Sequence, residues 1–247
     1  MSTRATFRLY KLDSLNPLIR ASIKCANQLG GSIDLEKEPN ARDDTIRYFF
    51  DNGLVLLNIN DFDGSFRLCQ EIGKALNCAW IELRIQEGNH WEYDLFLGDI
   101  NIDRFSADPD YFDPERDDKE ELKGKPKLVA KSFNIDIGRI EKYIQWWGPI
   151  IEPINEEIIH QVNTELGNIK IVSRSLDDIL KTPKRRLSGK AYEYDEFEYG
   201  DCWQMADFMK ALGYTRDTHD NYDARGIVSI SRNKNTFWRR IKSFFGL

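Results

Sequence analysis

Aromatic, acidic and arginine residues gather between residues 91 and 112, and aromatic and arginine side chains are favoured anchors of protein interfaces. The candidate partner-binding residues in this stretch are Trp91, Tyr93, Arg104, Asp108, Asp110 and Tyr111. They predict a strand pair that leads into a turn and presents a rim to another protein. The alternative is that residues 108–110 form only a turn and that the aromatic side chains close the core beneath it.

A second acidic and aromatic stretch covers residues 192–203, and its candidate partner-binding residues are Tyr199, Asp201 and Trp203. A helix is expected directly after it, so Asp201 can cap that helix and the other carboxylates gain from the helix dipole. The same stretch could also meet a basic partner, or fold onto the cations at residues 184–186 of the same chain.

The last residues form a third candidate surface. From Gly226 to Leu247 there is no acidic residue, and five cations accompany a set of large apolar side chains. A helix over 235–245 would place the apolar residues on one narrow arc beside the cations, which is typical of a membrane-surface or partner-binding helix. Its candidate residues are Phe237, Trp238, Arg239, Arg240, Ile241, Phe244 and Phe245. The alternative is a final helix that docks on the core of its own domain.

Signatures of enzyme chemistry are missing from the sequence. It contains no GxSxG, P-loop or GxGxxG motif, and its three histidines lie outside HExxH and HxH patterns. Residues 60–64 resemble part of a calcium loop, but Ile59 and Gln70 would occupy the first and last ligand positions. We therefore expect no metal and no cofactor. A hydrolase remains an alternative, with Asp103, Asp108, Asp110 and Asp201 as candidate acids, bases or metal ligands.

Composition narrows the class of protein further. The chain has 247 residues, of which 41% are hydrophobic, and a net charge of -6, which argues against a general nucleic-acid binder. Its four cysteines form no CxxC pair and are expected to be reduced core thiols. The N-terminus lacks the apolar run of a signal peptide, and no stretch is apolar enough to span a membrane. We therefore expect a cytoplasmic protein.

Local patterns predict strands and helices in the first half of the chain. A strand over 5–11 is followed by a helix over 16–29, and Asn52-Gly53 joins two strands over 45–50 and 54–59 in a tight hairpin. A helix from Asp63 to Asn77 comes next, and strands over 79–86, 91–97 and 100–105 follow it. Alternation of apolar and charged residues in these strands favours a mostly antiparallel sheet with packed helices.

An acidic stretch precedes a second half in which helical spacing dominates. Nine acidic and four basic residues lie between Asp103 and Lys123, together with two prolines, which predicts a linker over 114–126. Helices are then expected over 128–147, 156–166, 176–180 and 205–212. The predicted fold is therefore α+β, with a sheet domain over 1–113 and a helix-rich region over 127–247 packed on it.

Several segments resemble uncharacterised bacterial proteins. The resemblance is carried by Trp91-Glu92-Tyr93-Asp94-Leu95-Phe96-Leu97-Gly98, by the run from Asp103 to Phe112, by Gly124-Lys125-Pro126-Lys127 and by Ile140-Glu141-Lys142-Tyr143. It implies one recurrent module over about residues 80–147 and names no activity or catalytic residue. The chain is also loosely similar to small acidic α+β immunity and scaffold proteins.

These observations favour a bacterial cytoplasmic protein that binds another protein, such as an immunity or regulatory protein, and that is not an enzyme. The alternatives are a hydrolase that uses Asp or Glu, and a peripheral membrane protein attached through residues 235–247.

Overall fold

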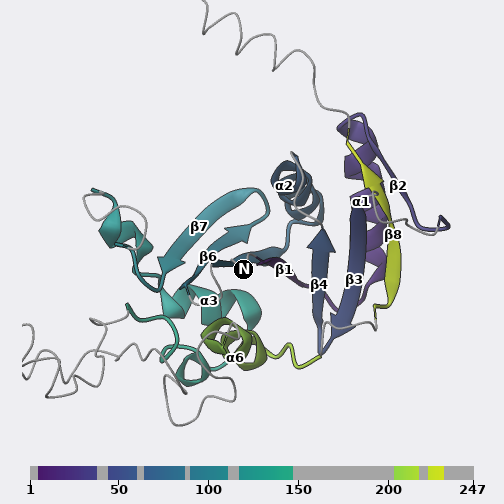
Figure 1. Ribbon diagram of the computed structural model, residues 1–247. Helices are drawn as coiled ribbons and strands as arrows, with labels where there is room; N and C mark the ends of the chain where they lie inside the picture. Colours follow the sequence, from purple (N-terminus) through teal and green to yellow (C-terminus); the bar gives the residue numbers. More distant parts are fainter. Residues whose placement is uncertain are drawn as a thin grey trace, which may run out of the picture. The chain divides into compact units, whose positions relative to one another are not determined.

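The structure of the chain is a computed structural model, and it describes residues 5–37, 44–59, 64–86, 90–110, 117–146, 203–216 and 222–230. These residues form an α+β fold in which eight strands make one sheet, in the order β2-β8-β3-β4-β1-β5-β6-β7 (Figure 1). The strands are β1 (Ala5–Lys11), β2 (Ser32–Asp34), β3 (Thr45–Asp51), β4 (Leu54–Ile59), β5 (Ala79–Gln86), β6 (His90–Leu97), β7 (Ile100–Ser106) and β8 (Ala224–Ser229). The helices are α1 (Asn16–Gln28), α2 (Ser65–Leu76), α3 (Pro126–Phe133) and α6 (Trp203–Leu212), with short 3-10 helices η1 (Lys119–Leu122) and η2 (Ile137–Arg139).

The chain folds into two compact units that are interleaved in the sequence. Unit 1 comprises Met1–Ala5, Leu83–Leu95 and Ile102–Tyr214, and unit 2 comprises Thr6–Glu82, Phe96–Asn101 and Thr215–Leu247. Part of the stretch expected to be a linker, residues 117–126, lies in unit 1, where Lys119–Leu122 forms η1 and the Leu122 side chain is buried.

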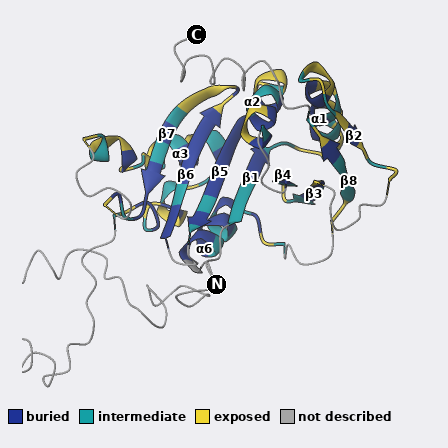
Figure 2. Ribbon diagram, turned by 45° about the horizontal axis from the view of Figure 1, so that its top comes forward, coloured by how far each residue is buried: buried dark blue, intermediate teal, exposed yellow. Residues whose placement is uncertain are grey.

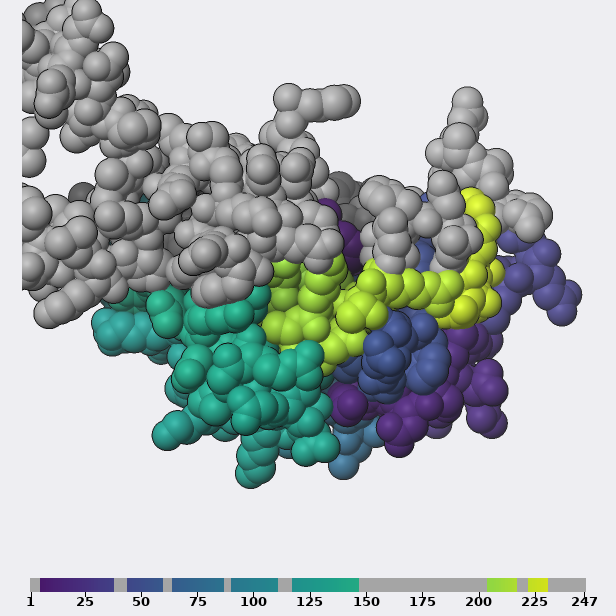
Figure 3. Space-filling model, turned by 90° about the horizontal axis from the view of Figure 1, so that it is seen from below, coloured from purple at the N-terminus to yellow at the C-terminus, as the bar shows by residue number. Residues whose placement is uncertain are grey.

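Aromatic packing builds the core of unit 1. The ring of Phe208 on α6 lies 5.1 Å from Trp91 and 5.9 Å from Tyr93, and Phe105 stacks on Tyr93 at 5.4 Å. Most of β6 is buried, as the dark blue of Figure 2 shows. Helix α6, light green in Figure 3, packs against the teal residues of the same unit. These contacts explain why the apolar spacing of residues 205–212 predicted a helix correctly, and Gly213 (φ 109°) ends it as expected.

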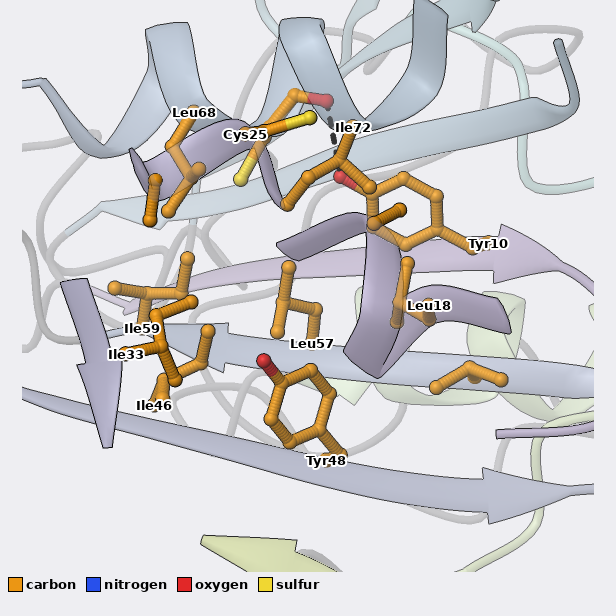
Figure 4. Close-up of a cluster of buried hydrophobic side chains, with 14 of the residues drawn as sticks. Tyr10, Leu18, Cys25, Ile33, Ile46, Tyr48, Leu57, Ile59, Leu68 and Ile72 are labelled. Carbon is orange, nitrogen blue, oxygen red and sulfur yellow. Dashed lines mark hydrogen bonds between the residues drawn. The ribbon is translucent and has the colours of Figure 1, made fainter. Parts of the chain in front are cut away.

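Unit 2 is built on the β3–β4 hairpin. Asn52 (φ 50°) and Gly53 (φ 75°) supply the positive φ angles of the turn, so the hairpin predicted from Asn-Gly is confirmed. Leu18 and Cys25 of α1 and Leu68 and Ile72 of α2 point toward Tyr48 and its neighbours on the strands (Figure 4). The Tyr10 hydroxyl donates to the Cys69 carbonyl at 3.2 Å, which satisfies the one polar atom that Tyr10 brings into this core.

The prediction of a helix-rich second half is wrong. The expected helix over 128–147 ends at Phe133, because Asn134 adopts the left-handed conformation (φ 55°), and η2 and turns follow it. Residues 224–229 form β8, which pairs with both β2 and β3, so this part of the chain completes the antiparallel sheet. The expected helices over 156–166, 176–180 and 235–245 lie outside the described residues. None of the helices in the described residues has the length and hydrophobicity that crossing a lipid bilayer requires.

Candidate protein-binding face

Charged side chains alternate along three strands of unit 1 and meet on one face of the sheet. Arg84 of β5 donates to Glu92 (Nε to Oε1, 2.6 Å) and to Asp94 (Nη2 to Oδ2, 2.6 Å) on β6. Arg104 of β7 donates to the other oxygen of Asp94 (Nε to Oδ1, 3.2 Å) and lies 3.8 Å from Asp118. We call Arg84, Glu92, Asp94, Arg104 and Asp118 the charged face.

Exposure on the charged face is greatest at Arg104 of β7 and at Asp118. The side chains of Asp94 and Glu92 are 12% and 22% exposed and that of Arg84 is 27% exposed, whereas Arg104 reaches 41% and Asp118 40%. Asp94 holds one arginine with each carboxylate oxygen. A half-exposed arginine is thus held in a defined orientation by a nearly buried carboxylate. Because the arginine is already ordered, less side-chain entropy would be lost when a partner binds it.

Glu92 is ionised at neutral pH. Its burial by itself raises the pKa, but the nearby His90 ring, the hydrogen bond from Arg84 and the charge of Arg84 outweigh burial and lower the pKa of Glu92 to about 2. The carboxylate therefore remains negative and keeps Arg84 in place at neutral pH.

A serine and a histidine lie at the buried end of the same sheet face, and their geometry differs from that of a nucleophilic triad. Ser106 Oγ is 3.5 Å from His90 Nε2, and Glu92 Oε2 is 4.0 Å from the same nitrogen. A catalytic histidine contacts the nucleophile through one ring nitrogen and is oriented through the other. Serine and glutamate both lie nearest one nitrogen here, and the side chains of Ser106 and His90 are almost fully buried, so the arrangement is not that of a catalytic triad.

The opposite face of β6 and β7 carries Trp91 and Tyr93, which lie in the core of unit 1. Each is only 1% exposed. Trp91 Nε1 donates to Gln204 Oε1 at 2.7 Å, and the Tyr93 hydroxyl donates to Asp103 Oδ2 at 2.8 Å. The structure therefore places these two predicted partner-binding residues in the interior, as the alternative interpretation held for the aromatic side chains.

Asp103 is a buried structural carboxylate. Besides the Tyr93 hydroxyl it accepts the Lys125 backbone N–H at 2.7 Å. Burial raises the pKa of Asp103, although these hydrogen bonds oppose that rise. The carboxylate ties β7 to the segment that leads into α3.

The other candidate carboxylates of this region have local partners. Asp108 Oδ1 accepts the Asp110 backbone N–H at 3.2 Å, which is the turn that Asp-Pro-Asp predicts, and Asp110 pairs with Lys119. Trp203 is the first residue of α6. Tyr111, Tyr199 and Asp201 lie outside the described residues, as do Phe237, Trp238, Arg239, Arg240, Ile241, Phe244 and Phe245.

No group of three or more His, Cys, Asp or Glu side chains in the described ranges is placed to hold a metal ion. The residues that resemble part of a calcium loop, 60–63, fall outside those ranges, as does His219.

Of the charged face, sequence reasoning identified Arg104 and missed its neighbours. Glu92 and Asp94 alternate with Trp91 and Tyr93 in the sequence. Because successive side chains of a strand point to opposite faces, the sequence alone could have predicted that these carboxylates lie on the other face from the aromatic pair. Arg84 could not be connected to them, because it lies on another strand and only the strand order shows that β5 and β6 are neighbours.

Comparisons with protein-family models, with curated proteins and with solved structures found no match.

Proposed function

We propose that this chain binds another protein, as a regulatory or immunity-like protein of the bacterial cytoplasm does, and that the charged face is its binding surface. The observation that supports the proposal best is the position of Arg104, whose side chain is 41% exposed while its Nε donates to the nearly buried Asp94. Arginine in such a position is a favoured anchor of protein interfaces.

The chemistry of the charged face also defines what a partner must offer. An arginine has five N–H donors in a planar fork, and the contacts of Arg104 within the described residues engage only Nε and Nη1. A carboxylate or an aromatic ring of the partner could use the donors and the guanidinium plane that remain. Asp118, which is 40% exposed, would in turn meet a cation of the partner.

The hydrolase alternative has less support among the described residues. Asp103 accepts two hydrogen bonds that tie β7 to the start of α3, Asp108 closes a turn, and Asp110 pairs with a lysine. Each of these carboxylates has a structural role, and each would have to give it up to act as an acid or a base.

The proposal is tested by capture from the native host with the tagged full-length chain, compared with Arg104→Ala and Arg104→Lys. The matched control is Lys127→Ala, which removes an exposed cation from α3 of the same unit. We expect one protein to be retained stoichiometrically by the parent chain and by the Lys127 variant. Retention should fall at least about 10-fold with Arg104→Ala and substantially with Arg104→Lys, because lysine keeps the charge but loses the fork.

Two outcomes would contradict the proposal. One is that the parent chain retains no protein, and the other is that a retained protein binds the Arg104 variants as well as the parent chain. Circular dichroism of each variant shows that a loss of binding is not a loss of folding.

A further inference from the structure

A row of three polar side chains crosses three adjacent strands of unit 2. Arg47 of β3 lies directly opposite Asn58 of β4 on one side and Arg225 of β8 on the other. Figure 1 shows these strands next to one another. Side chains directly opposite each other in antiparallel strands have Cβ atoms about 4.5–5.5 Å apart and share one face of the sheet. We call Arg47, Asn58 and Arg225 the arginine row.

The arginine row lies on the sheet face that is turned away from α1 and α2. Ile46 and Tyr48, which flank Arg47 in β3, point into the core that these helices cover (Figure 4). Because successive side chains of a strand alternate between the two faces, Arg47 lies on the opposite face, and Asn58 and Arg225 share that face through their register. All three residues are partly exposed, so small solutes reach the row.

The two arginines lack a carboxylate partner among the described residues. Arg47 makes no hydrogen bond or ion pair within that part of the chain. The guanidinium of Arg225 lies 5.4 Å from the centre of the Tyr222 ring, and its Nη1 donates to the Tyr222 hydroxyl at 3.2 Å. The Nε of Arg225 is buried and has no hydrogen-bond partner in the described residues. Donors of both arginines therefore remain for a ligand.

Neighbouring carboxylates on this face are bound to other groups. Asp223 Oδ2 pairs with Arg216 and accepts the Phe50 backbone N–H at 2.6 Å. Asp34 Oδ1 accepts two backbone N–H groups of the residues that follow β2, at 3.0 and 3.2 Å. Like charges directly opposite each other destabilise a sheet. The described residues thus hold two cations in opposite positions and supply no anion to offset their repulsion.

We propose that the arginine row binds a phosphate group, either as the free anion or as the end of a phosphate monoester. The two guanidiniums carry two positive charges, which match a phosphate dianion better than a carboxylate, and their planar forks bind phosphate oxygens in pairs. The Asn58 amide supplies two further N–H donors. The row belongs entirely to unit 2, so this site is independent of the proposal for the charged face.

Titration calorimetry of the full-length chain tests the site at about pH 8 and low salt, where phosphate groups are dianions. The probes are inorganic phosphate and phenyl phosphate, and the tighter of the two tells whether the site takes the free anion or a monoester. We expect a dissociation constant of about 1 mM or lower for the tighter probe, and binding of acetate at least about 10-fold weaker.

Substitutions that keep the side chain polar but remove its charge locate the site. Arg47→Gln and Arg225→Gln should each weaken phosphate binding at least about 10-fold, because each removes one of the two guanidiniums. The matched control Arg67→Gln changes an exposed arginine of α2 in the same unit and should leave binding unchanged. A parent chain that binds neither probe overturns the proposal, as does equal binding by Arg47→Gln and Arg67→Gln, or acetate bound as tightly as phosphate.

Thermal unfolding gives a second measurement, which also shows that each variant is folded. Without phosphate, Arg47→Gln should unfold at a higher temperature than the parent chain, because it removes one of two opposed like charges. Phosphate should raise the unfolding temperature of the parent chain and of Arg67→Gln and leave that of Arg47→Gln unchanged. An equal rise in the parent chain and Arg47→Gln overturns the proposal, and Arg225→Gln decides by the same comparison if Arg47→Gln does not fold.

Discussion

Glu92 lies between the buried His90 and Arg84, its ion-pair partner on the charged face. We expect it to give the free energy of unfolding a specific dependence on pH. Its pKa is about 2 in the folded chain against an ordinary value of 4.5, so the unfolded chain takes up the proton first as the pH falls. The stabilisation is therefore complete above about pH 5 and is lost progressively as the pH falls toward 2. We expect a loss of about 2 kcal/mol between pH 6 and pH 3.

Urea unfolding of the parent chain and of Glu92→Gln at several pH values isolates this contribution. The other carboxylates are the same in both proteins, so their effects cancel when one free energy of unfolding is subtracted from the other. Asp103 makes this comparison necessary, since its raised pKa acts with the opposite sign and lowers the free energy of unfolding as the pH rises. A difference between the two proteins that does not change from pH 6 to pH 3 would contradict the assigned role of Glu92.

The hydroxyl of Tyr93 should stabilise unit 1 through its bond to Asp103. Removing it by Tyr93→Phe leaves a buried carboxylate with one donor fewer, so we expect the free energy of unfolding to fall by about 1–2 kcal/mol. The control Tyr222→Phe removes a hydroxyl that accepts an exposed hydrogen bond from Arg225. This substitution should change the free energy of unfolding by less than about 0.5 kcal/mol. Equal effects of the two substitutions in chemical denaturation would show that the Tyr93–Asp103 bond adds nothing.

At the scale of elements, short sequence motifs predicted the turns and helices whose conformation depends on neighbouring residues. The β3–β4 hairpin was predictable because Asn52 and Gly53 are residue types that accept positive φ. The helix over 128–147 was extended too far because apolar spacing continues past Asn134, although asparagine is one of the few residues that end a helix in the left-handed conformation. Strand β8 was missed because six residues that include a glycine carry too weak a pattern, and the pairing of this strand with β2 and β3 depends on residues distant in the sequence.

The connection between η1 and α3 depends on Gly124, and this dependence can be measured. Gly124 has a φ of +70°, and a Cβ there would lie 2.5 Å from Ile144 Cγ2 and 2.8 Å from the Tyr93 hydroxyl. Gly124→Ala combines left-handed strain with overpacking and should lower the free energy of unfolding by about 3 kcal/mol. Gly138→Ala is the control, because its Cβ would meet only the end of the Asp136 side chain, at 3.0 Å. Thermal unfolding that ranks Gly138→Ala as the more damaging change would contradict this account of the connection.

At the scale of the whole molecule, the two units are assembled from segments that alternate along the chain. Local patterns of apolar and charged residues predicted an α+β protein, but they could not show this interleaving, because a strand is assigned to a unit by its neighbours in space. The candidate site shows the same limit. Arg104 was singled out by its residue type and surroundings in the sequence, whereas Arg84 and Asp118 join it only through the packing of β5, β6, β7 and η1.

The central claim is that the charged face binds a partner protein, and the dissociation constant of the purified complex tests it most directly. Once a captured partner is identified and purified, titration calorimetry with the parent chain, Arg104→Ala and Lys127→Ala at low and high salt gives that constant. We predict that Arg104→Ala raises it by about 10- to 100-fold, that the Lys127 variant leaves it unchanged, and that the parent complex weakens with salt. Equal dissociation constants for the parent chain and Arg104→Ala would contradict the claim and place the binding surface elsewhere.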